Sequence, residues 1–109
     1  MSHFPELLRM LPPFEGPFDA FKLEANNCDV LFASYPEGTV IPAHDHETEN
    51  VGVITQGELI LSVEGIERRY RAGEWYHVPA RALHSARFEI ETSEIEFWFY
   101  ARPDAQRER

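Results

Sequence analysis

Residues 38–57 read GTVIPAHDHETENVGVITQG, and this stretch carries most of the chain's information on fold and chemistry. Its short apolar runs, separated by turn residues, are typical of β-strands. Side chains alternate across a strand, so His44 and His46 are predicted to point the same way, with Cα atoms roughly 6.5–7 Å apart. Asn50 has the same parity. Two imidazoles at this spacing can share one ion, because neutral imidazole is the commonest protein ligand of first-row metals.

Apolar or alternating runs of the same kind recur through most of the chain, and no sustained helical periodicity competes with them. This texture predicts an all-β barrel or sandwich. The predicted strands are 29–35, 39–43, 50–55, 58–63, 66–71, 74–79, 84–90 and 94–100.

The chain is predicted to divide into an N-terminal extension over 1–28, a barrel over 29–101 and a flexible tail over 102–109. Residues 5–11 are expected to form one or two helical turns, since proline is tolerated in a first turn and a later proline stops the helix. Residues 12–22 are expected to be extended and to lay three aromatic side chains on the outside of the barrel: Phe14, Phe18 and Phe21.

Charge and cysteine content exclude several classes of protein. The 109 residues hold 10 basic and 19 acidic side chains, for a formal charge of −9. Such a charge disfavours binding to nucleic acid and to anionic membranes. Cys28 is the single cysteine, so no intramolecular disulfide is possible. No apolar run approaches the ~18 residues of a membrane span. We therefore expect a soluble cytoplasmic protein.

The histidine stretch resembles the first motif of the cupin superfamily. That motif consists of a glycine, five residues, His-x-His, three or four residues, a glutamate, six residues and a glycine. Gly38, His44, His46 and Gly57 fall on it, while Asn50 occupies the glutamate position.

A second block, GEWYHVPARALH from residue 73, is similar to the second cupin motif. Gly73, Pro79 and His84 match that motif. Arg81 stands where the motif has glycine, and Phe88 stands where it has asparagine. The two blocks imply a double-stranded β-helix, the cupin jelly-roll barrel.

The resemblance also implies one divalent transition metal, with Mn, Fe, Co, Ni, Cu and Zn left open. In metal-binding cupins the ion is held by residues that correspond here to His44, His46 and His84. The fourth place falls to Asn50, which is either a ligand or a polar group hydrogen-bonded in the barrel wall. A β-bulge that turned Glu49 inward is the alternative for the fourth position. A neutral amide leaves the metal charge near +2, which favours an anionic ligand or activated water, and it removes the general base that a glutamate can supply.

Three functions remain open from the sequence. The first is a small metalloenzyme with dioxygenase-like or isomerase/lyase-like chemistry on a small organic molecule. The second is a non-catalytic module that binds or senses a small ligand, and the third is a metal-free structural barrel. The resemblance further implies a homodimer.

The run 94–100 alternates with a period of two, which predicts a strand with one face in the core. We expect the apolar side, with Phe97 and Phe99, to face the core. The acidic side, with Glu94 and Glu96, is expected to be solvated.

Overall fold

The computed structural model describes residues 4–100, which form one short helix and nine strands. The elements are α1 (Glu6–Arg9), β1 (Asp19–Ala25), β2 (Cys28–Tyr35), β3 (Val40–His44), β4 (Glu49–Gln56), β5 (Glu58–Val63), β6 (Ile66–Arg71), β7 (Trp75–Val78), β8 (His84–Arg87) and β9 (Thr92–Phe99). The tail predicted over 102–109 lies outside the described residues.

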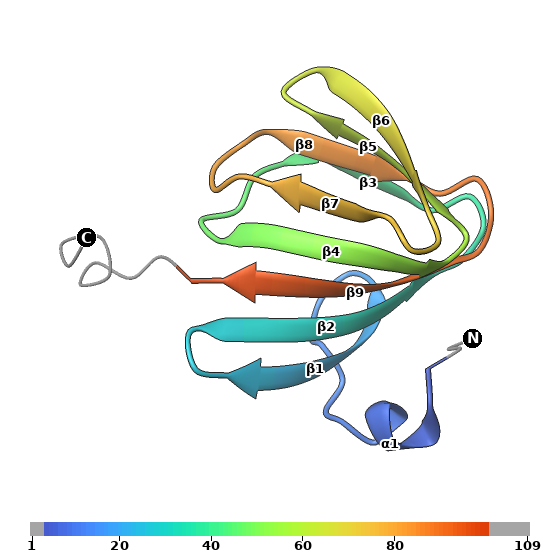
Figure 1. The fold of residues 1–109 in the computed structure, drawn as a ribbon, viewed down its shortest axis with the longest axis vertical. Helices are drawn as coiled ribbons and strands as arrows, with labels where there is room; N and C mark the ends of the chain where they lie inside the picture. Colours follow the sequence, from blue (N-terminus) through green and yellow to red (C-terminus); the bar gives the residue numbers. More distant parts are fainter. Residues whose placement is uncertain (1–3, 101–109) are drawn as a thin grey trace, which may run out of the picture.

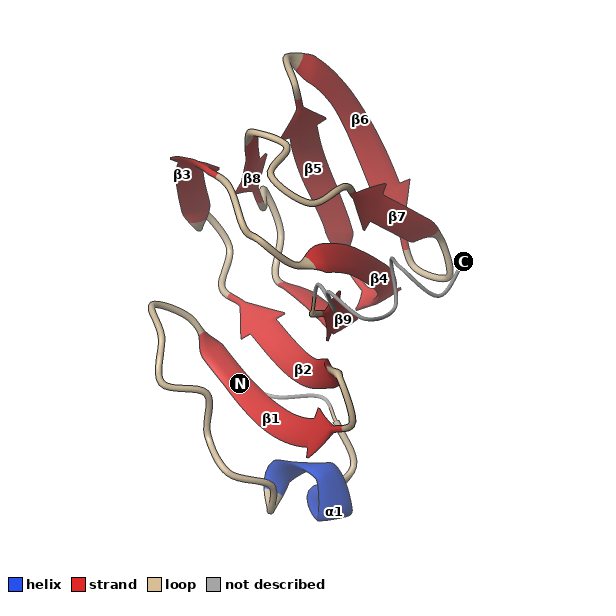
Figure 2. Ribbon diagram, turned by 90° about the vertical axis from the view of Figure 1, so that its left-hand side faces the viewer, coloured by secondary structure: helices blue, strands red, loops and turns tan. Residues whose placement is uncertain are grey.

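Two antiparallel sheets face each other. One has the order β1-β2-β9-β4-β7 and the other the order β3-β8-β5-β6. Consecutive strands often lie in different sheets, so the chain winds back and forth across the space between them, as Figures 1 and 2 show. The all-β prediction is confirmed, and every predicted strand matches an observed one to within a few residues.

The N-terminal segment differs from the prediction in two respects. Residues 19–25 form β1, which pairs with β2 along its whole length. Phe14 and Phe18 stack at 4.8 Å, and both line the cavity between the sheets instead of lying on the outside. Residues 21–25 (FKLEA) alternate between apolar and polar side chains, but this run is short and follows a Pro- and Phe-rich segment, and it is not among the predicted strands.

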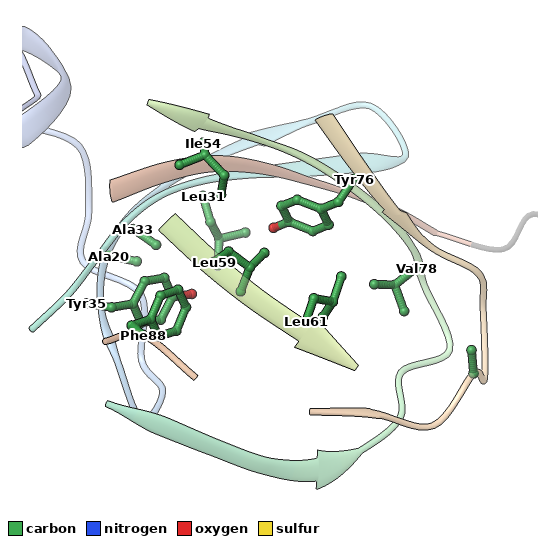
Figure 3. Close-up of a cluster of buried hydrophobic side chains, with 11 residues drawn as sticks. Ala20, Leu31, Ala33, Tyr35, Ile54, Leu59, Leu61, Tyr76, Val78 and Phe88 are labelled. Carbon is green, nitrogen blue, oxygen red and sulfur yellow. The ribbon is translucent and has the colours of Figure 1, made fainter. Parts of the chain in front are cut away.

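The space between the sheets holds the buried core. It includes Leu31, Ile54, Leu59, Leu61 and Val78, and Figure 3 shows these side chains directed inward from both sheets. Removing these groups from water stabilises the sandwich, at about 25 cal/mol for each Å² of apolar surface buried.

The prediction for the two faces of β9 is wrong. Glu94 is only 3% exposed, and Glu94 and Glu96 both line the interior cavity. Phe97 and Phe99 stack on the opposite, outer face of the sheet, and Phe99 is 44% exposed. A period of two separates the faces of a strand but does not say which face is inside.

Candidate metal centre and pocket

The three histidines nominated from sequence meet at one end of the cavity. His44 ends β3 and His84 begins β8, and the two residues are direct partners across the antiparallel pair. His46 follows in the loop after β3. Their ring centroids lie 4.2–5.1 Å apart, and one ligand atom from each residue falls within 4.8 Å of the others.

Backbone carbonyls orient two of the three rings. The Nδ1 of His44 lies 2.7 Å from the Pro42 carbonyl, and the Nδ1 of His84 lies 2.9 Å from the Ala82 carbonyl. A carbonyl can only accept, so Nδ1 carries the proton in each ring and Nε2 keeps its lone pair. This arrangement is the one that outer-shell groups impose on metal-ligating histidines.

Burial keeps the rings of His46 and His84 neutral. Burial, followed by repulsion from His44 and His84, lowers the pKa of His46 from 6.5 to about 4. Burial also lowers the pKa of His84. Neutral imidazole is the form that binds a metal, so His46 and His84 need not release protons near pH 7.

The geometry of the ring nitrogens fits one ion. The Nε2 atoms of His44 and His46 are 3.1 Å apart. Ligands at ~2.0–2.1 Å from a tetrahedral zinc lie roughly 3.3 Å from each other. The pair therefore needs only a small adjustment to share an ion.

Asn50 and Glu49 lie on opposite sides of β4. Asn50 is 1% exposed and lines the cavity, where its Oδ1 accepts a hydrogen bond of 2.6 Å from Thr48. Glu49 turns outward, and its carboxylate lies 2.6 Å from Nε2 of the exposed His77. Of the two residues, Asn50 is therefore the one that lines the same cavity as the histidines.

Arg81 links the two motif segments through its backbone. Its N–H donates a 2.7 Å hydrogen bond to the carbonyl of His46. The backbone of Arg81 makes this contact in a left-handed conformation, with φ of 67°. A side chain is strained in this region, whereas glycine is not. This explains why the second cupin motif has glycine at the position.

The cavity beside the histidines has a volume of about 370 Å³. That size suits a small organic ligand. Its walls are mostly apolar and include Phe14, Phe18 and Phe88. Phe88, which replaces the motif asparagine, stacks on Tyr35 with the ring centroids 4.1 Å apart (Figure 3).

A buried acidic cluster, which the sequence analysis missed, lies in the cavity wall. The Tyr76 hydroxyl lies 2.8 Å from Glu94 Oε1 and also contacts Glu96 Oε2. Tyr35 donates a hydrogen bond of 3.1 Å to Glu94 Oε2, and Trp98 Nε1 donates one of 2.6 Å to Glu96 Oε1. The Trp98 ring also lies 5.0 Å from His46, so it joins the cluster to the histidines.

The cluster favours the protonated form of its carboxyls. Burial, and then the charge of Glu96, raises the pKa of Glu94 from 4.5 to about 8. Burial also raises the pKa of Glu96. The signal that could have revealed this pair was the same period of two, read with the opposite face inside.

Comparison with known families decides the classification. The family model described as a cupin domain matches residues 31–98, most of the chain. The protein belongs to the cupin family. A search of curated proteins finds no match.

Several solved structures share the fold over 81–95% of the chain. An RmlC-like cupin from Shewanella frigidimarina is 22% identical with a TM-score of 0.76, over 95% of this chain and 94% of that one. KdgF from a Halomonas species is 22% identical with a TM-score of 0.70, over 81% and 83% of the two chains. The cupin domain of Schizosaccharomyces pombe Cnp3 is 13% identical with a TM-score of 0.77, over 93% and 77%. At these identities the similarity establishes the fold alone.

Proposed function

We propose that this cupin holds one divalent transition metal on His44, His46 and His84 and binds a small organic anion beside it. The convergence of three ligand nitrogens within 4.8 Å of one another in the wall of one cavity carries this proposal. Asn50 is the fourth, neutral ligand. Three imidazoles suit any of Mn, Fe, Co, Ni, Cu and Zn, so availability decides among them.

The ligand class follows from charge and surface. Neutral donors leave the ion near +2, which favours an oxygen anion from the ligand or acidifies a bound water. The apolar walls of the cavity then receive the carbon skeleton. A bound metal would supply Lewis acidity, which makes a metal-dependent enzyme the first candidate, either dioxygenase-like or isomerase/lyase-like.

Elemental analysis tests the metal site directly. The protein is purified without chelators or a histidine tag, beside His44→Ala, Asn50→Ala and, as a matched control, His77→Ala. We expect near-stoichiometric metal in the wild type and in His77→Ala, little in His44→Ala, and partial retention in Asn50→Ala. Absence of metal from the wild type after incubation with a panel of divalent ions refutes the proposal.

The second candidate is a binding or sensory module that holds its ligand without turnover. The mostly apolar cavity is compatible with it, because such cavities bind small molecules with or without catalysis. A ligand that raises the melting temperature and is recovered unchanged identifies this case, whereas conversion of the ligand identifies the enzyme.

We also propose a homodimer in the cytoplasm. The outer face of the five-stranded sheet carries an aromatic row in which Trp75 is 57% and Phe99 44% exposed, with Phe97 stacked between them at 6.3–6.4 Å. Exposed apolar patches of this kind mark interfaces. Light scattering should give twice the chain mass, and Trp75→Ser should lower the measured mass.

The single cysteine, Cys28, supports the cytoplasmic location. No helix in residues 4–100 has the length and apolarity to cross a membrane.

A further inference from the structure

We propose that Glu94 and Glu96, bridged by Tyr76, are the proton-transferring residues of the pocket and share one proton at neutral pH. This inference rests on the proposed function, because it concerns the ligand held at the histidines. It favours proton transfer, as in an isomerase or lyase, over oxidation by dioxygen.

Counting hydrogens shows why the cluster needs an extra proton. Four contacts join the two carboxyl groups to the surrounding rings, one at each carboxyl oxygen. Tyr35, Tyr76 and Trp98 supply one hydrogen each, so three contacts are satisfied. The Tyr76 hydroxyl cannot donate to both carboxyls at once. A proton on Glu94 or Glu96, donated to the Tyr76 oxygen, completes the network.

Charge balance requires the same proton. No lysine or arginine of the described residues lines the cavity, and its other titratable groups are Tyr35, Tyr76 and the three histidines. In the metal-free protein, two adjacent carboxylates without a cation are strongly disfavoured in such surroundings, and one of them takes up a proton. The raised pKa of Glu94 agrees with this count.

The backbone makes room for the cluster. Gly52 lies in the middle of β4, directly between Tyr76 on β7 and Glu96 on β9. A Cβ at Gly52 would overlap the Tyr76 ring and hydroxyl. Glycine in a central strand marks close approach of another group. Here its missing side chain lets Tyr76 extend across β4 to both carboxyls, and Figure 3 shows the Tyr76 hydroxyl directed into the interior.

The chemistry that this arrangement serves is proton movement on a carbonyl compound. With the oxygen end of the substrate at the histidines, the ionised carboxylate takes a proton from the carbon next to the carbonyl. The C–H electron pair forms the enol double bond, and the carbonyl π electrons move to the carbonyl oxygen. The other carboxyl returns its proton to a second atom of the substrate. The pair again holds one proton, the substrate is isomerised, and no oxidant or reductant is consumed.

The substrate class follows from the pocket. A 2-oxo acid offers an anionic oxygen and a carbonyl to the histidine end, and an alkyl group to the apolar walls. Its C3 hydrogens are acidic enough for a carboxylate to exchange them.

Carbon-13 NMR of glutamate carboxyl groups in the metal-free protein tests the shared proton. We expect the wild type to release one proton from Glu94 and Glu96 near pH 8, a step that is absent in Glu94→Gln and in Glu96→Gln. The exposed variant Glu37→Gln keeps it. Two ionised carboxylates in the wild type at pH 7 overturn the inference, whether or not the protein binds metal.

Deuterium exchange tests the catalytic role. The zinc-loaded protein is incubated in D₂O with pyruvate and, separately, with 4-methyl-2-oxopentanoate, and loss of the C3 hydrogens is followed by proton NMR. We expect exchange by the wild type, slowed about 10²-fold or more in Glu94→Gln and Glu96→Gln at unchanged zinc content. No exchange by the zinc-loaded wild type, or equal rates in the variants, overturns the inference. Failure to load zinc or any other divalent ion of the panel instead refutes the proposed metal site.

Discussion

Replacing Glu94 by glutamine should stabilise the protein at alkaline pH. Glutamine keeps the shape of the protonated acid: its oxygen accepts from Tyr35, and its amide donates to the Tyr76 oxygen, 2.8 Å away in the wild type. Tyr76 then donates to Glu96. All four contacts are satisfied without a titrating proton.

The sign of the pH dependence follows from the direction of the shift. Glu94 has a folded pKa of about 8 against 4.5 in the unfolded chain, so between these values the folded protein holds a proton that the unfolded chain releases. The stability this proton contributes is complete below pH 4.5 and is lost as the pH rises to about 8. Each pH unit costs about 1.4 kcal/mol, and the whole window from 4.5 to about 8 costs on the order of 5 kcal/mol. Since domains are stable by about 5–15 kcal/mol, the loss should be large.

Urea unfolding of the metal-free protein at pH 6, 7 and 8 measures this term. For each pH unit, the free energy of unfolding of the wild type should fall by roughly 1.4 kcal/mol more than that of Glu94→Gln. The stability of the variant relative to the wild type therefore increases as the pH rises. Glu37→Gln removes an exposed carboxylate and should follow the wild type. Parallel stability curves for the wild type and Glu94→Gln would refute the shared proton and the count of hydrogen bonds behind it.

Three further predictions concern the metal site and its supports. Zinc at 100 times its dissociation constant should stabilise the wild type and His77→Ala by about 2.7 kcal/mol, and His44→Ala far less, as thermal unfolding will show. Arg81→Gly should leave stability unchanged or raise it by up to about 1 kcal/mol in urea, because the φ of 67° costs glycine nothing; a clear loss would show that the Arg81 side chain has a structural role. Phe88→Asn should cost about 3–5 kcal/mol through loss of the buried ring stacked on Tyr35, and a near-neutral result would show that this wall of the cavity collapses without penalty.

The sequence was informative where local chemistry sets local structure. Strand positions followed from the spacing of apolar runs and turns, because a strand needs only alternation and a place to end. His44 and His46 were identified by parity, although β3 ends at His44 and His46 lies in the following loop. That His84 pairs directly with His44 could not be derived from spacing. It came from the family resemblance, since register between distant strands depends on the whole fold.

The failure on β9 has a physical cause that connects the pocket with the outer face. The prediction assumed that the apolar side of an alternating strand packs inward, which holds when the interior is a core. Here the interior holds a cavity as well as the core, and β9 directs Glu94 and Glu96 into this cavity while Phe97 and Phe99 lie on the outer face. Two buried carboxyls lower stability, and an apolar pair would pack there at less cost.

Local rules fail mainly at functional positions, where the stability lost is recovered elsewhere. The orientation of β9, with its acidic side inward and its apolar side outward, therefore supports two proposals together. Its inner face carries the shared proton next to the histidines, and its outer face carries the aromatic row that a second subunit would cover. If light scattering shows a monomer at micromolar concentration, the outer aromatic row loses this explanation, while the hydrogen count that places the proton on the inner face is unaffected.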